Sequence, residues 1–380
     1  MFKLFQSNQM PLLVEAYTQR RTSIETAPFN PEIVLVQNHG MGQWLKLELA
    51  QHMGIAANIS AELPGTYITG LYHQFLRTPV EKESAYSRNI LTWHIMDVLN
   101  STGTAQKTNN PFLPLINYLD GEGDRDLRLY QLSHQLAGLY EQYLIYRPAW
   151  IHAWDKGAPG PLICQQHPWQ ALLWQEIIRR TDERHRANLH LELLGIIDSI
   201  NPTELPARVS LFGFSSLPPM HFDTFRALAE KVEVDIYFLN PCQHYWGDIV
   251  SPKDIARRSV RDLIEQTSDA ALADEDYMDI GNPLLSSMGK QGREYFELLL
   301  SEESLDDATH FAPSAPNTIL SLLKNDVLNL EFGGSFGAGA QPEKLPHAAN
   351  DTSIRIHSCH SKSREVEVLL DQIYQRCSDD

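Results

Sequence analysis

The chain has 380 residues, of which 43% are hydrophobic and 21% charged, a composition typical of soluble globular proteins and long enough for two or three domains. No apolar run approaches the roughly 20 residues that span a bilayer, and four dispersed cysteines without metal-site spacing indicate a reducing cytoplasm and no zinc site. The net charge of −17 lies mainly after residue 200, where fifteen Lys/Arg face twenty-nine Asp/Glu, so nucleic-acid contact is expected mainly in residues 1–200.

The first 83 residues predict an α/β segment. A strand over Phe2–Phe5 precedes a helix that ends near Arg21, and the aliphatic run Ile33–Val36 predicts a buried strand. A loop with two glycines is expected over Asn38–Gly42, followed by a helix over Gln43–Met53. Strand, glycine loop and helix are the setting of a phosphate-binding loop.

That loop lacks the side chains that nucleotide chemistry needs. A phosphate-binding loop ends in a Lys that reaches the phosphates and a Ser or Thr that holds Mg²⁺. Gln43 and Trp44 stand at these positions. We therefore expect neither ATP binding nor any other cofactor.

Residues 84–200 predict helices with few strand signals. The clearest is Arg125–Tyr146, whose apolar residues recur every three or four positions and which Pro148 ends. Four of the seven tryptophans lie between positions 150 and 174. They predict the core of a helical subdomain, with a base-stacking platform as the alternative.

Strand character returns after Pro206. Arg208–Phe214, Met220–Lys231 and Val232–Leu239 predict strand, helix and strand, hence parallel strands in a covered sheet. Residues 310–350 predict a loop or linker, and a new strand is expected over Ser353–Ser358 before a helix that reaches Cys377.

The predicted fold is a Rossmann-like α/β domain with a parallel sheet, interrupted by an all-helical insertion. The boundaries are residues 1–83 and 201–345 for the α/β domain, 84–200 for the insertion and 346–380 for the start of a second, truncated domain.

No catalytic or metal site is predicted. The strands over Val209–Phe214 and Val234–Leu239 end without the acidic residue that holds Mg²⁺ in ATPases. Asp274–Asp276 is acidic enough for nuclease chemistry, but without a nearby strand or Lys it predicts solvated surface. The fifteen histidines include no pair at metal-ligand spacing.

Several motifs, in the same order along the whole chain, resemble the N-terminal third of the RecC family, the gamma chain of exodeoxyribonuclease V. They are Val36–Leu45, Met53–Ile59, Gln142–Trp150, His185–Leu189, Leu217–Pro219, Asn240–Cys242, Tyr245–Ile249, Gly281–Leu285, His360–Ser361 and Arg364–Val368.

This resemblance implies that the α/β domain has a P-loop, superfamily-1 helicase-like fold without a working ATPase site, and that residues 346–380 begin a second, truncated helicase-like domain. It implies a subunit that holds two partner motors, RecB and RecD, splits the incoming duplex and scans the 3′-ended strand for Chi. The positions that match the scanning surface of the family are Gln37, His39, Gln43, Leu63, Leu139, Glu141, Arg147 and Arg186.

These residues suit base contact, because a Gln amide both donates and accepts and an Arg pairs with or stacks on a base. Gln37 as a loop cap and Arg147 as a charge at a helix end are the structural alternatives. Thr69 stands where the family often has an aromatic residue and Gly138 where an acid is common, which leaves open the sequence that is recognised.

The predicted function is therefore that of a non-catalytic, cytoplasmic subunit that binds single- and double-stranded DNA and its partner subunits. A structural helical adaptor without DNA contact and an active P-loop ATPase are the alternatives. Salt-dependent binding of single strands tests the first, and stabilisation by ATP tests the second.

Overall fold

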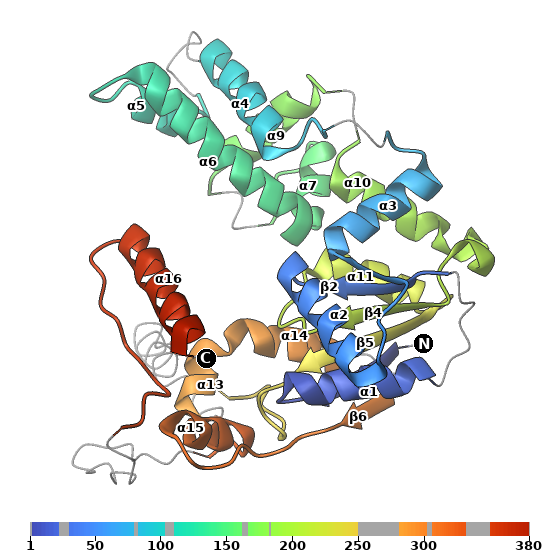
Figure 1. The fold of residues 1–380 in the computed structure, drawn as a ribbon. Coiled ribbons are helices and arrows are strands. Elements are labelled where there is room, and N and C mark those ends of the chain that lie inside the picture. The colour runs from blue at the N-terminus through green and yellow to red at the C-terminus, as the bar shows by residue number, and fades with distance from the viewer. Residues whose placement is uncertain are drawn as a thin grey trace, which may run out of the picture. The chain divides into compact units, whose positions relative to one another are not determined.

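A six-stranded sheet organises the N-terminal part of the protein, in the order β3-β2-β4-β5-β1-β6 (Figure 1). The computed structural model describes residues 2–22, 30–79, 83–102, 110–161, 166–181, 184–249, 281–301, 306–331 and 350–379. The strands are β1 Phe2–Ser7, β2 Glu32–Val36, β3 Ile59–Glu62, β4 Arg208–Phe212, β5 Glu233–Leu239 and β6 Asp306–Thr309.

Pairing in the sheet confirms the prediction of parallel strands. β2 pairs in parallel with β3 on one side and with β4 on the other, and β4 pairs in parallel with β5. Val34 of β2 faces both Ala61 and Ser210 in this register. Two strands separated by more than 170 positions are thus direct neighbours, as expected if both flanks of the helical segment build one sheet.

Helices supply most of the remaining regular structure. Their bounds are α1 Met10–Thr22, α2 His39–Met53, α3 Pro64–Leu76, α4 Arg88–Thr102, α5 Leu113–Leu119, α6 Arg125–Tyr146, α7 Pro148–Asp155, α9 Trp169–Ile178, α10 Arg186–Ile196, α11 Pro219–Leu228, α13 Pro283–Met288, α14 Lys290–Leu300, α15 Ile319–Leu328 and α16 Lys362–Asp379, with short 3₁₀ turns η1 Ile197–Ser199 and η2 Pro202–Glu204. No helix in the described part of the chain is long and apolar enough to cross a bilayer.

Helices cover both faces of the sheet. α1 and α2 bury one face, where Tyr17 meets the rings of Phe212 and Tyr237 at centroid distances of 6.2 and 5.3 Å. α3 and α11 cover the other face, where Phe2 stacks on Phe222 at 5.8 Å. A sheet buried on both faces explains the continuous apolar runs of β2, β4 and β5.

Buried ion pairs tie the amino edge of the sheet, where β2, β4 and β5 begin, to the end of α1. The Arg208 side chain is 2% exposed and pairs with Glu32, whose other oxygen accepts from Arg21 at 2.7 Å. Asp235, fully buried, accepts from Arg20 at 3.0 Å. Burial lowers the pKa of Arg208, but the carboxylates of Glu32 and Asp235 and the nearby tyrosine hydroxyls together outweigh it, so the net shift is upward.

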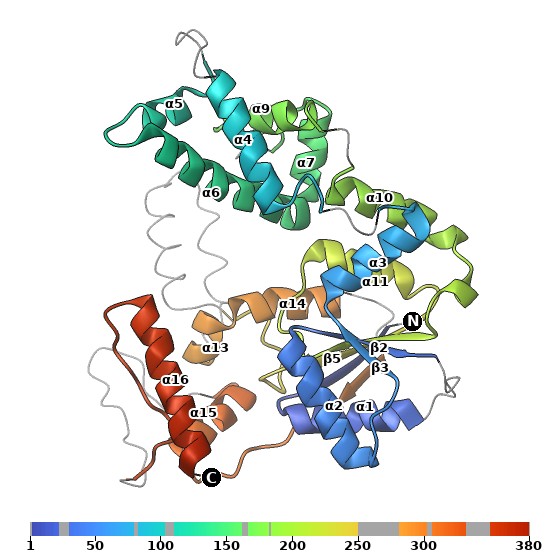
Figure 2. The ribbon, with the colours of Figure 1, turned by 45° about the horizontal axis from the view of Figure 1, so that its top comes forward.

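The described residues between α3 and β4 are mainly helical. α4 packs along α6 and α9, and together with α5 and α7 these helices enclose a core of their own (Figure 2). Trp154 and Trp174 are fully buried in this core and Trp150 and Trp169 pack against it, which confirms the core interpretation of these tryptophans. α10 contacts both α3 and α11, so it joins this helical block to the sheet.

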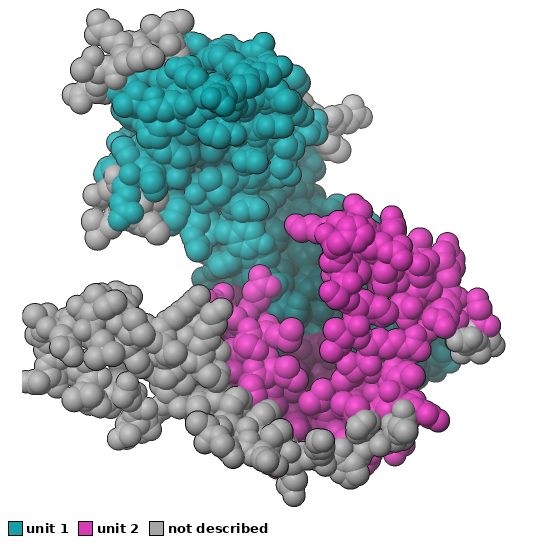
Figure 3. All heavy atoms as spheres, turned by 90° about the vertical axis from the view of Figure 1, so that its left-hand side faces the viewer, with its two compact units in different colours: residues 1–5, 10–238, 302–308 teal, residues 6–9, 239–301, 309–380 magenta. Residues whose placement is uncertain are grey.

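The chain divides by its contacts into two compact units (Figure 3). Unit 1 comprises residues 1–5, 10–238 and 302–308, and unit 2 comprises 6–9, 239–301 and 309–380. Within unit 2, the buried amide of Asn240 accepts from Trp246 at 3.0 Å and donates to Gln6 at 2.8 Å. This division by contacts does not test the domain boundaries expected from the sequence, which were drawn from the order of the predicted elements. Those boundaries stay a prediction.

Several element predictions need correction. Pro148 ends α6 but also opens α7, because its missing N–H is unneeded at a first helical position. α15 lies inside the supposed linker over 310–350, and a capping box between Thr318 and Ser321 starts it. Ile354–His357 forms no strand and Ile356 is 93% exposed, although the helix after it is present as α16. A strand needs a neighbour to pair with, and local sequence cannot supply one.

Some predictions fall on segments outside the described residues. They are the acidic surface at Asp274–Asp276 and most of the loop or linker expected over 310–350 between α15 and residue 350.

Candidate nucleic-acid interface

The carboxyl edge of the sheet, where β2, β3 and β4 end, is the expected ligand position of such a fold. The chain leaves β2 through α2 toward β3, and leaves β4 through α11 toward β5, in the opposite direction. Open α/β sheets bind ligands in the crevice where the strand order reverses in this way. The reversal here lies between β2 and β4.

Gln37 and Ser215 meet at this reversal. Gln37 directly follows β2, Ser215 follows β4, and the Gln37 amide Nε2 donates to Ser215 Oγ at 3.1 Å. Both residues are exposed. Gly213, between β4 and Ser215, has φ +72°, a conformation that glycine adopts without strain. The sequence interpretation missed Ser215, because Gln37 was identified by its match to the family and Ser215 lies three residues after the end of β4.

The predicted glycine loop is helical instead. α2 begins at His39, four residues earlier than expected, because the Asn38 side chain caps it by accepting from the N–H of Met41 at 2.9 Å. Asn is among the strongest N-cap residues, so it outweighs the low helix propensity of two glycines. Gln37 cannot be the cap of this segment, and that alternative is wrong.

The resulting connection is too short to form a phosphate-binding loop of the P-loop type. Two residues, Gln37 and Asn38, join β2 to α2, whereas a phosphate-binding loop wraps its ligand with about six residues before its Lys. Gly42 has a packing role: a Cβ there would lie 2.9 Å from Ala61 Cβ and 3.4 Å from Val36 Cγ2. The glycine therefore lets α2 approach β2 and β3 closely.

His39, Gln43 and Leu63 belong to the same edge. His39 and Gln43 are exposed on the first turns of α2, and the half-buried Leu63 follows β3 as the N-cap residue of α3. With Gln37, these residues bring four of the eight predicted contacts to the carboxyl edge. Their side chains offer two amides, an imidazole and an apolar surface.

Three further predicted residues lie on the C-terminal half of α6 and its end. Leu139 is half-buried and packs on the core of the helical block, Glu141 is half-buried, and Arg147 is exposed. Arg147 is the C-cap of α6, its Nη1 donates to Tyr146 O at 3.0 Å, and its guanidinium lies 5.7 Å from the Trp150 ring centroid. The alternative of a helix-end charge therefore describes its position correctly.

Arg186 is the eighth predicted residue and opens α10. It is half-buried between α3 and α11, close enough to influence both Tyr72 and His221. Burial, and then the positive charge of Arg186, lower the pKa of His221 to about 4. Among the described residues, no carboxylate pairs with Arg186.

The two groups of predicted residues come from the same unit. Figures 1 and 2 both show the C-terminal end of α6 on the side of the sheet where α2 begins, and α6 contacts α11, which starts after β4.

The two residues that differ from the family pattern, Thr69 and Gly138, make local contacts in unit 1. Thr69 donates to Gly65 O at 2.7 Å, and a Cβ on Gly138 would lie 3.2 Å from Arg88 Nε.

The described residues form no cluster of three or more His, Cys, Asp or Glu that could hold a metal ion.

The arrangement is that of an α/β protein whose sheet edge presents amides and a hydroxyl. Nucleotide-binding α/β proteins carry a phosphate-binding loop at this position. A family described as RecC, N-terminal domain, matches residues 2–330, and the chain belongs to this family.

Curated relatives carry the name RecBCD enzyme subunit RecC. The Escherichia coli protein is 33% identical over 100% of this chain and 36% of its own length, and the Haemophilus influenzae protein is 32% identical over 98% and 36%. The protein of Mycolicibacterium smegmatis is 28% identical over 93% and 29%. The chain thus spans about a third of the length of the relatives it matches.

Proposed function

We propose that this chain is the DNA-handling N-terminal part of a non-catalytic subunit of the exodeoxyribonuclease V helicase–nuclease, which acts in double-strand break repair and recombination. Its partners are RecB and RecD, and its role is to split the duplex and to scan the 3′-ended strand for Chi. The observation that carries the proposal is the carboxyl edge, where Gln37, bonded to Ser215, replaces a phosphate loop. Family membership supports the subunit role.

The chemistry of the edge favours bases over nucleotide phosphates. The Nε2 of Gln37 is held by Ser215, so its Oε1 faces outward as an acceptor, and Gln43 adds a second exposed amide on α2. Arg147 and Arg186 supply cations from the helical block. Amides and guanidinium groups are the side chains that read base edges, and one good contact contributes about 1–3 kcal/mol of discrimination.

The test replaces Arg147 or Arg186 with Ala in the assembled complex with both partner subunits. We expect the sequence-dependent response to weaken by about tenfold or more for each change, while the unwinding rate stays within about twofold, because base contacts discriminate and motors lie in other subunits. The matched control is Arg125→Ala, an exposed arginine at the opposite end of α6. Equal effects from Arg125→Ala, or loss of unwinding with unchanged sequence response, would contradict the proposal.

A second measurement separates DNA contact from a purely structural role. Single-strand binding should fall steeply with salt, because each neutralised phosphate releases counterions. Binding that does not change with salt, or no binding in the complex, favours the adaptor. Magnesium-dependent ATP turnover that is lost on changing Gln43 would instead show that the chain is an active P-loop ATPase.

A further inference from the structure

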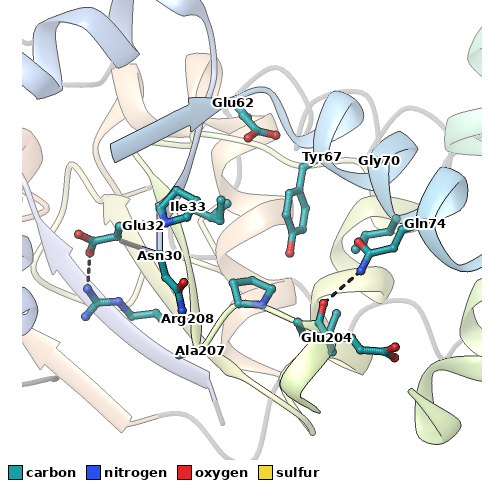
Figure 4. A pocket seen from close by; sticks show the side chains of 14 residues that line it. Asn30, Glu32, Ile33, Glu62, Tyr67, Gly70, Gln74, Glu204, Ala207 and Arg208 are labelled. Carbon is teal, nitrogen blue, oxygen red and sulfur yellow. Dashed lines mark hydrogen bonds and ion pairs between the residues drawn. The ribbon is translucent and has the colours of Figure 1, made fainter. Parts of the chain in front are cut away.

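A cavity of about 500 Å³ opens beneath α3, between the amino ends of β2 and β4 and the end of β3 (Figure 4). Its walls come from the starts of β2 and β4, the end of β3, one side of α3 and the segment before β4. The volume falls in the range of small-ligand pockets. Apolar groups of Ile33, Leu71 and Pro206 form much of the lining.

The hydroxyl of Tyr67 has no hydrogen-bond partner among the described residues, although Tyr67 is only 9% exposed. Figure 4 shows the Tyr67 ring extending from α3 with its hydroxyl pointing into the cavity. Burial, and then the nearby carboxylate of Glu62, raise the pKa of Tyr67 above its usual range. A buried phenol without a partner costs free energy, and a bound polar group would recover it.

The charge of the lining is negative. Glu62 and Glu204 belong to it, as does Glu32, whose charge is already matched by Arg21 and Arg208. Arg208 is the one basic residue among the described lining residues, and its guanidinium is held by Glu32. Glu62 accepts from the Ser60 hydroxyl at 2.7 Å but has no cationic partner among the described residues.

Gly70 keeps the cavity open. It lies on the side of α3 that lines the cavity, and a Cβ built there meets nothing within 4 Å. Its backbone is ordinary helix, so no positive φ requires glycine at this position. The space beside it is therefore available to a ligand.

We propose that this cavity binds the side chain of an arginine presented by another polypeptide. The guanidinium donates to the Glu62 carboxylate and to Tyr67 Oη, while its aliphatic stem contacts Leu71 and Pro206. A planar cation suits this lining because it combines charge pairing with a face that packs on an aromatic ring. The site shares no residue with the proposed DNA contacts, although Glu62 directly precedes Leu63.

The first experiment titrates the 380-residue chain with N-acetyl-L-arginine amide and, in parallel, with N-acetyl-L-citrulline amide, which has the same shape without the charge. We expect a dissociation constant on the order of 1 mM for the arginine probe, as ligand efficiencies of small molecules allow. We expect no saturable binding of the citrulline probe. Equal binding of both probes would overturn the proposal.

Two variants locate the site. Glu62→Gln keeps the bond from Ser60 and should weaken arginine binding at least tenfold, and Gly70→Leu fills the cavity and should abolish it. The matched control is Glu48→Gln, a similarly half-buried acid on α2, across the sheet from α3. Binding that survives Gly70→Leu, or that falls equally in Glu48→Gln, places the arginine elsewhere and overturns the proposal.

A third arm identifies the source of the cation. The pentapeptide Gly-Gly-Arg-Gly-Gly is titrated beside free L-arginine and should bind at least as tightly, because a side chain presented by a polypeptide leaves its backbone outside the cavity. Binding of free arginine without binding of the peptide would assign the cavity to a metabolite and overturn the docking role.

Discussion

At the scale of single residues, Asn38 decides what the carboxyl edge can do. By capping α2 at its own position, it shortens the connection after β2 to two residues and turns both glycines into helix. Gly42 then serves the close contact between α2 and the strands below it. The glycines that suggest phosphate binding in the sequence thus serve helix packing in the fold.

Replacing Gly42 with Ala should lower the free energy of unfolding by about 1–3 kcal/mol, because the new methyl group would lie 2.9 Å from Ala61 Cβ. Urea unfolding measures the change. The control is Gly195→Ala on α10, where a Cβ meets nothing within 4 Å and alanine should stabilise by about 0.4–1 kcal/mol. Equal stability of the two variants would show that the helix–strand contact is loose.

His221 makes stability depend on pH. Its folded pKa of about 4 lies below the ordinary value of 6.5, so the unfolded chain binds the proton first as the pH falls. Stability from this residue is therefore complete above pH 6.5 and is lost between pH 6.5 and 4. The full loss is about 3 kcal/mol, at 1.36 kcal/mol per unit of pKa.

We expect His221→Gln to reduce the difference in unfolding free energy between pH 6.5 and pH 4, compared with the chain that keeps His221. Urea titrations at several pH values measure it. The control is His167→Gln, which changes an exposed histidine before α9. An unchanged slope in His221→Gln would mean that His221 is accessible to water in the folded state.

At the scale of elements, the start of α10 depends on a network that spans three helices. The Nδ1 of His185 accepts from the N–H of Asn188 at 3.2 Å and so caps α10. Its other nitrogen donates to Asp155 at 2.9 Å, and Asp155 also accepts from the Trp174 indole at 2.9 Å. Burial raises the pKa of Asp155, but these hydrogen bonds and the nearby histidines outweigh it and lower the pKa overall.

Asp155→Ala should therefore destabilise unit 1 by about 1–3 kcal/mol, because it leaves the buried His185 and Trp174 donors without an acceptor. Denaturation followed by tryptophan fluorescence measures the loss, and Trp174 should report it directly. Asp198→Ala, at an exposed carboxylate of η1, is the control. If both variants unfold at the same urea concentration, the cap does not depend on Asp155.

At the scale of the whole molecule, unit 1 is built from chain segments that are far apart in sequence. β2 and β4 are neighbours although the helical block separates them, and α10 contacts both α3 and α11 on the sheet. The apolar surface of α3 and α11 is covered partly by that block. Neither part can unfold without exposing the other.

Hydrogen exchange should therefore show one opening free energy for the core amides of β4 and α6. Both segments belong to a unit whose packing is continuous, and small cooperative units open together. Mass spectrometry of exchanged peptides measures the two values, with the exposed end of α16 as a fast-exchanging control. If α6 exchanges at a much lower free energy than β4, the helical block folds as a domain of its own.

The sequence by itself determined the local elements and their types. Aliphatic runs identified β2, β4 and β5, and the spacing of leucines gave α6 with both of its bounds, because periodicity reports which face of an element is buried. It also predicted the parallel pairing, since a helix between two strands requires it. The missing Lys after Gly42 was visible without coordinates.

Only the tertiary structure decided what depends on partners distant in sequence. Ile354–His357 has the composition of a strand but pairs with no strand in the described part of the chain, and the bond between Gln37 and Ser215 joins residues 178 positions apart. The unpartnered hydroxyl of Tyr67 and the buried pair of Arg208 with Glu32 also arise from contacts between elements. Such features follow from packing in three dimensions, which local propensity does not encode.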